Sequence, residues 1–311
     1  MAKWAWVFPG QGSQFVGMGR DLVEVYPVAG ETFERANSIL GFDLASICFE
    51  GPEEELRQTR YTQPAILVHS VAVLRILENG AARPAFVAGH SVGEYAALVA
   101  NGALAFEDAL RLVRIRAEAM YASGLERPGG MAAIMGMPEV NLEPLLAEVR
   151  RSGLVEPANY NSPVQIVLSG EVSAIEQAVK VASSFGAKRA VRLNVSGAFH
   201  SSLMTTARDS LAGALREVTF SRPRVPVVSN VTAKDVTEPG EIASLLERQL
   251  TSPVMWRQSV KYMVDRGVDC FVEVGPGSVL CGLIKRSAPA GRCVPTSDLK
   301  SIETFLQEVR P

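Results

Sequence analysis

A serine in the stretch VAGHSVGEYAALVA, residues 87–100, carries the first pattern that could do chemistry. Gly89, Ser91 and Gly93 form the motif G-x-S-x-G between an apolar run typical of a short strand and a pattern typical of a helix. In that context a sharp strand-to-helix turn presents the serine hydroxyl as a nucleophile, beside the partial positive charge of the helix N-terminus. The alternative is a serine that only caps the helix, and the placement of strand and helix favours the nucleophile.

A nucleophilic serine needs a general base, and the chain holds three histidines. His69 lies in an apolar helical stretch, which is typical of a core histidine. His90 adjoins Ser91, where neighbouring side chains on a turn diverge, so we do not expect it to be the base. His200 lies in NVSGAFHSSLM, a loop between a predicted strand and a predicted helix, where catalytic groups are usually placed. No acid stands out at the end of a core strand between Ser91 and His200, so we predict a Ser-His dyad whose imidazole is oriented by a non-acidic group.

An arginine occupies the apolar side of a predicted helix in FEDALRLVRIRAEAMYA, residues 106–122. At about 100° per residue, Arg116 falls within about 20° of Ala109, at the centre of the apolar stripe. A buried guanidinium is costly unless a partner neutralises it. That partner is either a structural acid or a substrate carboxylate held by two parallel hydrogen bonds. We favour the second, so the sequence indicates a serine acyl enzyme whose substrate carries a carboxylate.

The glycine-rich stretch FPGQGSQFVGMG, residues 8–19, has the composition of a phosphate-binding loop. A dinucleotide loop requires G-x-G-x-x-G, and Phe15 stands where the third glycine should be. The Gly-Lys-Ser/Thr ending of the Walker motif is also missing. We therefore expect no nucleotide site, and Gly10 and Gly12 are instead expected to give the backbone a tight path around Gln11.

Short apolar runs alternating with helical patterns predict an α/β fold. In the larger part of the chain we predict strands and helices in alternation, with strands at 4–8, 85–88, 225–229 and 270–274 and helices at 63–79, 91–100 and 107–122. After a Gly/Pro-rich break at 123–130, the predicted order is β-α-β-β-α-β, the ferredoxin-like pattern, with elements at 131–135, 138–150, 155–160, 164–169, 171–185 and 187–193. We therefore predict a large subdomain of residues 1–125 and 197–311 and an inserted small subdomain of residues 126–196.

The composition argues against several classes of protein. The 31 Lys and Arg residues nearly balance the 33 Asp and Glu residues, unlike the basic surface of a nucleic-acid-binding protein or a polybasic membrane anchor. No apolar run reaches the roughly 18 residues of a membrane span, and the N-terminus lacks a signal-peptide pattern. We therefore expect a cytoplasmic protein with no nucleic-acid or membrane partner. Because there is no C-x-x-C pair, we also expect no zinc site and no disulfide, and all four cysteines reduced: Cys48, Cys270, Cys281 and Cys293.

Taken together, these motifs resemble those of the malonyl-CoA:acyl carrier protein transacylase family nearly from end to end. The matching stretches follow in the same order: FPGQGSQ, GHSVGEYAALV, RIRAEAM, ANYNSPVQIVLSG, GAFHSSLM, SNVTA, QLTSPVMW and EVGPGSVLCGLIKR. Their combination is highly specific, whereas G-x-S-x-G alone is not. The resemblance implies an α/β-hydrolase-like core with a parallel sheet and an inserted ferredoxin-like subdomain, in agreement with the predicted order of elements.

The resemblance implies catalytic roles for the matching residues. Ser91 would attack the thioester of malonyl-CoA, and His200 would take its proton and return it to the departing thiol. Gln249 matches the position that orients the histidine, which fits the missing acid. The backbone N–H groups of Gln11 and Val92 would form the oxyanion hole.

The resemblance implies binding roles as well. Arg116 would hold the malonyl carboxylate, as its helical position already suggests. Phe199, in the triplet Ala-Phe-His, matches the form that goes with malonyl in polyketide relatives, where Ser at this position goes with methylmalonyl. We also place further residues at the substrate-binding cleft: His90, Met120, Asn159 and Asn161.

The implied reaction is a ping-pong transfer of malonyl from coenzyme A to the phosphopantetheine thiol of acyl carrier protein. It needs no cofactor and no metal, its partners are malonyl-CoA and acyl carrier protein, and the family implies a monomer in fatty acid or polyketide synthesis. The carrier is acidic in this family, so docking is expected to use basic residues, although each candidate is equally well read as a solvated surface charge: Lys188, Arg189, Arg192, Lys285 and Arg286.

Three alternatives to this reading remain at the level of the sequence. The same dyad would make an acyl-thioester hydrolase if water entered the acyl enzyme, although Arg116 argues against a simple apolar esterase. A transacylase for a different extender unit of a polyketide synthase is the second. A carrier-binding scaffold without activity is the third, and the intact Ser91, His200, Arg116 and Gln249 argue against it.

Overall fold

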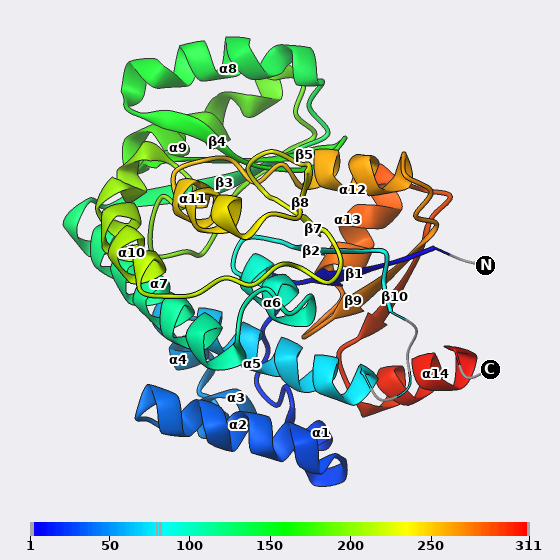
Figure 1. The fold of residues 1–311 in the computed structure, drawn as a ribbon. Coiled ribbons are helices and arrows are strands. Elements are labelled where there is room, and N and C mark those ends of the chain that lie inside the picture. Colours follow the sequence, from blue (N-terminus) through cyan, green and yellow to red (C-terminus); the bar gives the residue numbers. More distant parts are fainter. Residues whose placement is uncertain (1–2, 79, 81–82, 310–311) are drawn as a thin grey trace.

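The larger of two β-sheets lies at the centre of the molecule (Figure 1). The computed structural model describes residues 3–78, 80 and 83–309. Across these residues the larger sheet has the strand order β10-β9-β1-β2-β7-β8, and neighbouring strands are parallel except for β7 and β8. Its strands are β1 (Trp4–Phe8), β2 (Phe86–Gly89), β7 (Val227–Val228), β8 (Asp235–Val236), β9 (Cys270–Val274) and β10 (Arg292–Thr296).

Helices cover both faces of this sheet, because side chains along each strand alternate between two cores. In β1, Trp6 and Phe8 belong to the larger apolar cluster, whereas Ala5 and Val7 belong to the cluster that α12 and α13 complete. The helices of this part of the chain are α1 (Arg20–Val25), α2 (Pro27–Leu40), α3 (Leu44–Phe49), α4 (Glu53–Leu56), α5 (Thr59–Leu77), α6 (Gly93–Ala100), α7 (Phe106–Glu126), α10 (Thr205–Arg216), α11 (Pro239–Gln249), α12 (Trp256–Val264), α13 (Val279–Ser287) and α14 (Leu299–Val309). Among the described residues no helix has the length and apolar character needed to cross a membrane.

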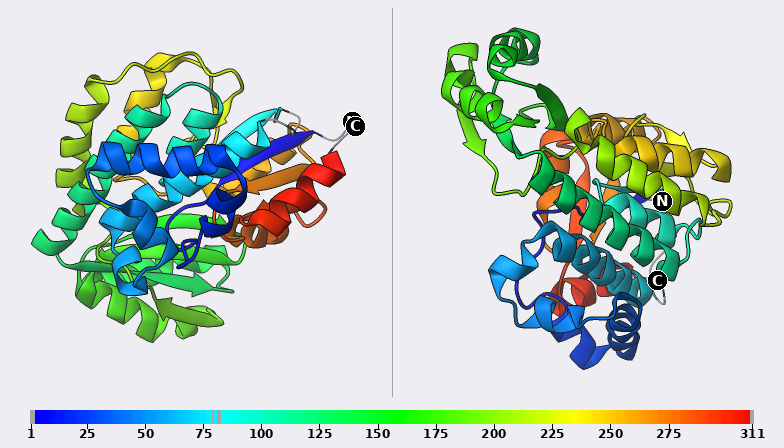
Figure 2. Two further views of the ribbon diagram at one scale, coloured as in Figure 1. Left: turned by 90° about the horizontal axis from the view of Figure 1, so that it is seen from below. Right: turned by 90° about the vertical axis from the view of Figure 1, so that its left-hand side faces the viewer.

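A second, antiparallel sheet is formed by the middle of the chain, with the strand order β4-β5-β3-β6. Its elements follow the predicted β-α-β-β-α-β sequence: β3 (Gly129–Met135), α8 (Leu142–Val149), β4 (Val155–Ser162), β5 (Gln165–Glu171), α9 (Val172–Val181) and β6 (Arg189–Arg192). These elements enclose an apolar core of their own and stand to one side of the larger sheet, as Figure 2 shows. The prediction of a mixed α/β fold with a mainly parallel sheet is therefore confirmed, with a separate antiparallel sheet beside it.

The two loops singled out in the sequence leave adjacent strands of the larger sheet. Strands β1 and β2 are parallel and in register, with Phe8 opposite Gly89 at their carboxyl ends. The loop of Gln11 follows β1 and the turn of Ser91 follows β2. Because parallel strands release their following loops at the same edge, residues 80 positions apart in the chain meet at one site.

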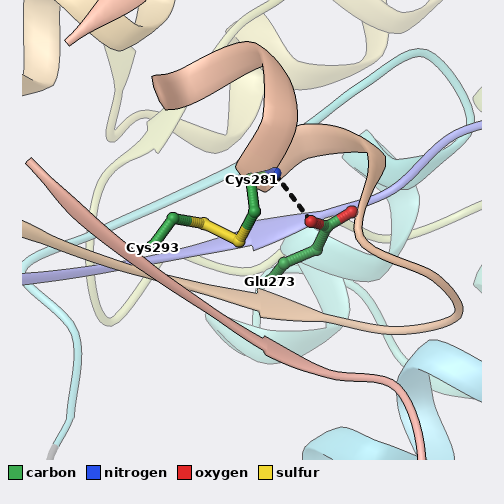
Figure 3. Close-up of side chains that lie close together, drawn as sticks. All are labelled: Glu273, Cys281 and Cys293. Atoms are coloured by element: carbon green, nitrogen blue, oxygen red, sulfur yellow. Dashed lines mark hydrogen bonds between the residues drawn. A yellow bond between two sulfur atoms is a disulfide. The ribbon is translucent and has the colours of Figure 1, made fainter. Parts of the chain in front are cut away.

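Two cysteines form a disulfide, and the prediction that all four are reduced is wrong for this pair. Cys281 on α13 is bonded to Cys293 on β10, with their Cα atoms 5.2 Å apart (Figure 3). The chain runs from α13 directly into β10, so the turn between them brings two cysteines 12 residues apart within disulfide range. The other two, Cys48 and Cys270, are free and buried.

Glu273 on β9 lies next to this disulfide, and the three side chains form a potential metal-ligating group with ligand atoms within 4.8 Å of one another. Its carboxylate oxygens accept the N–H groups of Leu280 and Cys281, at 2.9 and 2.7 Å. Both sulfur atoms are in the disulfide and both carboxylate oxygens cap the start of α13. The arrangement therefore holds the helix against the sheet rather than presenting free ligands.

Candidate active site

The turn that carries Ser91 is tight and has backbone strain. Ser91 has a φ of 53°, in the left-handed region that L-residues rarely adopt. A Cβ on Gly89 would lie 1.9 Å from the carbonyl carbon of Gly93, and one on Gly93 would lie 2.2 Å from the carbonyl oxygen of Phe8. Both glycines are therefore needed for the close approach of turn, helix and strand. The Ser91 N–H donates to Oδ1 of Asn230 at 2.7 Å, which helps to hold the strained residue in place.

His200 is placed to act as a base toward Ser91. The Ser91 Oγ lies 2.7 Å from His200 Nε2, and His200 Nδ1 lies 2.9 Å from the backbone carbonyl oxygen of Gln249. Since a carbonyl only accepts, Nδ1 carries the proton and Nε2 is left free to accept the serine proton. Burial, with the positive charge of Arg116, lowers the pKa of His200 to about 3, so the imidazole is neutral near pH 7. The orienting group is a peptide carbonyl, in keeping with the predicted non-acidic partner.

Arg116 is buried beside the serine, with 1% of its surface exposed. Its Nη2 donates to Ser91 Oγ and to Gln249 Oε1, both at 3.0 Å, and its Nη1 donates to Gln63 Oε1. Within the described part of the chain it forms no ion pair with an acid, and its Nε has no hydrogen-bond partner. Burial lowers its pKa. The oxygens that accept from this buried guanidinium are all neutral. Its positive charge is therefore not compensated by these contacts and favours binding of a carboxylate.

Glu94 is a buried acid that sequence reasoning missed. It is 4% exposed and lies on α6, one turn after the serine. Its Oε2 accepts from Gln249 Nε2 at 2.6 Å and from the backbone N–H of Asn230 at 3.4 Å. Burial raises its pKa to about 7, against the opposing effects of Gln249, Asn230 and Arg116. A signal was present, because Glu94 is the one charged residue in the apolar helix GEYAALVA. The same reasoning that selected Arg116 would have found it.

In the part of the chain that the structure describes, two residues at the cavity beside Ser91 have unpaired backbone N–H groups. Among the described residues, neither the N–H of Gln11 nor that of Val92 has an acceptor, and both residues line the cavity at Ser91. The side chain of Gln11 is fixed by a hydrogen bond from Thr59 to its Oε1 at 2.7 Å. Gly12 has a φ of 103°, and a Cβ on Gly10 would lie 2.5 Å from the His90 carbonyl oxygen. The glycines thus bring the loop against the serine turn.

A cavity of about 90 Å³ collects most of the predicted site residues. Its lining includes Gln11, His90, Ser91, Val92, Arg116, Met120, Asn159, Phe199 and His200. A second cavity, of about 350 Å³, shares Gln11, His90 and Asn159 with the first and adds Asn161. Asn161 lies 2.8 Å from His90 Nε2, so it contacts the first cavity only through the histidine ring. Gln249 lines neither cavity and reaches the site through its hydrogen bonds.

His69 lies outside this cluster, as predicted for a core histidine. It is fully buried on α5, and burial lowers its pKa to about 4. Gln63 and Asn230 join the site although sequence reasoning did not select them. Gln63 contacts Arg116, which is 53 residues away along the chain. Asn230 contacts Ser91, which is 139 residues away.

The chain is similar to known proteins over nearly its whole length. Residues 5–302 match the family described as Acyl transferase domain. The chain is 46% identical over 287 residues to the malonyl CoA-acyl carrier protein transacylase of Escherichia coli K12, covering 92% of this chain and 93% of that protein. It is 44% identical over 311 residues to the protein of the same name from Bacillus subtilis, covering 100% and 98%. A solved malonyl-transacylase in complex with its type II polyketide synthase acyl-carrier protein superposes with a TM-score of 0.95 at 41% identity, covering 99% of this chain and 100% of that one.

Proposed function

Because this chain belongs to the acyl transferase family, we propose that it transfers the malonyl group of malonyl-CoA to the phosphopantetheine thiol of acyl carrier protein. The relatives that match it over nearly their whole length bear the name of that activity. One observation of the chain itself carries the proposal: a buried guanidinium without an acid partner in the described residues lies 3.0 Å from the candidate nucleophile. A thioester whose acyl group ends in a carboxylate supplies what Arg116 lacks.

In the first half-reaction, His200 Nε2 takes the proton of Ser91 while Oγ attacks the thioester carbonyl. The developing oxyanion is held by the free N–H groups of Gln11 and Val92, and one such donor contributes about 10²–10³ in rate. The tetrahedral intermediate then collapses, the carbon–sulfur bond breaks, and His200 returns the proton to the thiol of CoA. The product is a malonyl ester on Ser91.

In the second half-reaction, the carrier's thiol takes the place of CoA. His200 accepts the thiol proton, the sulfur attacks the malonyl ester, and the same two N–H groups hold the oxyanion. The intermediate collapses with release of Oγ, which recovers its proton from His200. Because one thioester is exchanged for another of similar energy, the reaction runs in both directions, and the site's main task is to exclude water.

Selectivity for malonyl rests on Arg116 and on Phe199, which line the same cavity. A malonyl carboxylate pairs with the guanidinium, whereas an acetyl group leaves it buried without an acid partner. Phe199 is 5% exposed and lines the same cavity as Arg116 and Met120, so a branched extender unit competes with its ring for space. We assign the remaining candidates, His90, Asn159 and Asn161, to the channel that the CoA or carrier arm follows.

The larger cavity supplies a path for that arm and a place for the carrier. It is bordered by Leu193 and Asn194, which follow β6, and by Val279, Leu280 and Leu283 on α13. Exposed basic residues lie on or next to the same two segments: Lys188, Arg189, Arg192, Lys285 and Arg286. Arg192 pairs with Glu176 at 3.2 Å, so the others are the better contacts for an acidic carrier.

We also propose the finer features of the architecture and setting. The larger sheet with its helices corresponds to an α/β-hydrolase-like core made of residues 1–125 and 197–311. The strand order of the smaller sheet supports a ferredoxin-like subdomain of residues 126–196. The protein acts as a cytoplasmic monomer in fatty acid or polyketide synthesis, without a cofactor, a metal, a nucleic acid or a membrane.

The test is to incubate the protein with malonyl-CoA, with and without holo acyl carrier protein, and to measure malonyl-carrier and free malonate together. We expect malonyl-carrier to form much faster than malonate. Malonate formed faster than malonyl-carrier would instead identify an acyl-thioester hydrolase. A panel of acyl-CoA substrates in the same assay then ranks malonyl against branched extender units.

A further inference from the structure

Glu94 and Gln249 form a buried link between the serine turn and Arg116. Going from one end to the other, the Glu94 carboxylate accepts from Gln249 Nε2, and Gln249 Oε1 accepts from Arg116 Nη2. The same Nε2 also donates to the backbone carbonyl of Ser91 at 3.1 Å. The three charged or polar side chains belong to three different helices, α6, α11 and α7. They are 4%, 0% and 1% exposed.

We propose that Glu94 is a positioning residue for the transfer reaction, which fixes the amide of Gln249 and through it both Arg116 and His200. This inference rests on the proposed function, because it concerns the same site. Glu94 touches neither the thioester nor the malonyl group in this scheme. It acts by holding Gln249, whose side chain contacts Arg116 and whose backbone carbonyl contacts His200.

The two neighbours of the Gln249 side chain fix the direction of its amide. A carboxylate only accepts hydrogen bonds and a guanidinium only donates them. Gln249 can therefore satisfy both neighbours in one orientation, with NH₂ toward Glu94 and oxygen toward Arg116. A flipped amide would place donor against donor and acceptor against acceptor. Replacing Glu94 by a neutral amide removes this constraint, because glutamine offers both a donor and an acceptor.

The charges support the same role. In the described residues no acid contacts Arg116 directly, and Glu94 is the buried carboxylate whose charge acts on it. A head-to-tail chain of carboxylate, amide and guanidinium polarises each hydrogen bond in it and spreads the compensating charge. Arg116 is thereby held in place beside Ser91, while its Nε has no hydrogen-bond partner among the described residues.

The ionisation of Glu94 gives the proposal a signature that a packing role lacks. The groups facing Glu94 are Tyr95 on its own helix, Arg116 on α7, Gln249 on α11 and the loop residue Asn230. Burial raises the pKa of Tyr95, so the phenol stays neutral. Burial raises the pKa of Glu94 to about 7, so the ionised form that holds the amide is lost as the pH falls through that value. The pKa of His200 is lowered to about 3, so the histidine does not titrate in this range.

The first experiment measures kcat/KM for malonyl transfer from pH 5 to 8.5 in the wild type and in Glu94→Gln. We expect the wild-type value to fall below about pH 7 and the variant to lack that fall. At pH 8, Glu94→Gln should lower kcat/KM for malonyl transfer by about 10- to 100-fold, which is the range for loss of a hydrogen bond to a charged group. It should also lower the ratio of malonyl to acetyl transfer, because Arg116 is no longer held.

Glu273→Gln is the matched control. Glu273, on β9, is the other buried glutamate among the described residues, and burial raises its pKa to about 7 as well. It contacts the start of α13 and none of Arg116, Gln249 or His200. This variant should keep the wild-type pH profile and the wild-type malonyl-to-acetyl ratio. If the fall of kcat/KM below about pH 7 disappeared in Glu273→Gln and persisted in Glu94→Gln, the positioning role of Glu94 would be overturned.

A double-mutant cycle tests whether Glu94 acts through Gln249. Glu94→Gln is introduced into the wild type and into Gln249→Ala, and thermal unfolding is recorded for all four proteins. In the wild-type background, Glu94→Gln should lower kcat/KM for malonyl transfer by at least about 10-fold. In the Gln249→Ala background, the same substitution should lower kcat/KM by less than about twofold. Equal costs in both backgrounds would refute the proposal. If the wild type itself transfers no malonyl, the proposed function fails first, which separates the two outcomes.

Discussion

The serine turn at the end of β2 and the small antiparallel sheet differ in backbone strain and in the kind of side chain that they bury. In the small sheet's unit, α8 buries Leu142, Leu145, Leu146 and Val149, which is the regular i, i+3, i+4, i+7 spacing of an amphipathic helix. Around the serine turn, the described chain has two of its three non-glycine residues with positive φ, Ser91 and His200. A guanidinium and a carboxylate are buried in the same place.

This difference indicates that the core of the small sheet serves stability, whereas the residues around the serine turn serve the reaction. Backbone strain and buried charge each destabilise a fold by about 1–3 kcal/mol or more unless neighbouring groups hold them. Where they gather around one cavity, the surrounding fold must hold a reactive arrangement in place. Changes at the serine turn should therefore affect activity more than stability, and changes in the small core should do the reverse.

The largest effect is expected for Ser91→Ala. Without the nucleophile no acyl enzyme forms, so malonyl transfer should fall by about 10⁴-fold or more, with little change in unfolding temperature. The measurement is initial rate of malonyl-carrier formation beside a thermal unfolding curve. A variant that keeps more than a tenth of the wild-type rate would remove Ser91 from the reaction.

The next largest effect is expected for Arg116→Ala. Malonyl transfer should lose about 10²–10³-fold in kcat/KM, as for loss of one partner in a buried charge pair, while acetyl transfer loses far less. Steady-state rates with both acyl-CoA substrates give the ratio. An unchanged ratio would show that Arg116 serves only the fold. Arg114→Ala, on the exposed side of the same helix and paired with Glu118, is the control.

Sequence patterns predicted the elements and the residues whose local context is unusual. Ser91 was found from its turn motif and Arg116 from its place on an apolar helix stripe, since both signals lie within one element. Asn230 and Gln249 meet the serine turn from 139 and 158 residues away along the chain, so no local pattern selects those contacts. The disulfide was missed for a related reason, because it depends on how α13 turns into β10.

In the small sheet's unit, Leu145→Ala should act on stability. Leu145 is fully buried in that core, and its truncation should cost about 2–5 kcal/mol of unfolding free energy. The kcat for malonyl transfer of the folded fraction should stay within about twofold of the wild type. Denaturant unfolding and rates measured on the same sample check both parts. A large loss of kcat with unchanged stability would contradict the division between the two regions.

The smallest effect is expected for the double variant Cys281→Ser and Cys293→Ser. The disulfide closes a short loop, so its loss should lower the free energy of unfolding by at most about 3 kcal/mol if the disulfide acts by restricting the unfolded chain. The loss should be smaller because Glu273 still holds the start of α13. Thermal unfolding with and without a thiol reductant measures this. The wild type should respond to the reductant and the variant should not; identical responses would mean that the disulfide has no part in stability.

The most direct test of the central claim is mass spectrometry of the whole protein after seconds of exposure to single acyl-CoA substrates. We expect one malonyl adduct on the peptide that contains Ser91. It should be lost on addition of holo acyl carrier protein and be much weaker with acetyl-CoA. An adduct on another residue, or malonylated carrier formed with no adduct on the protein, would contradict the central claim.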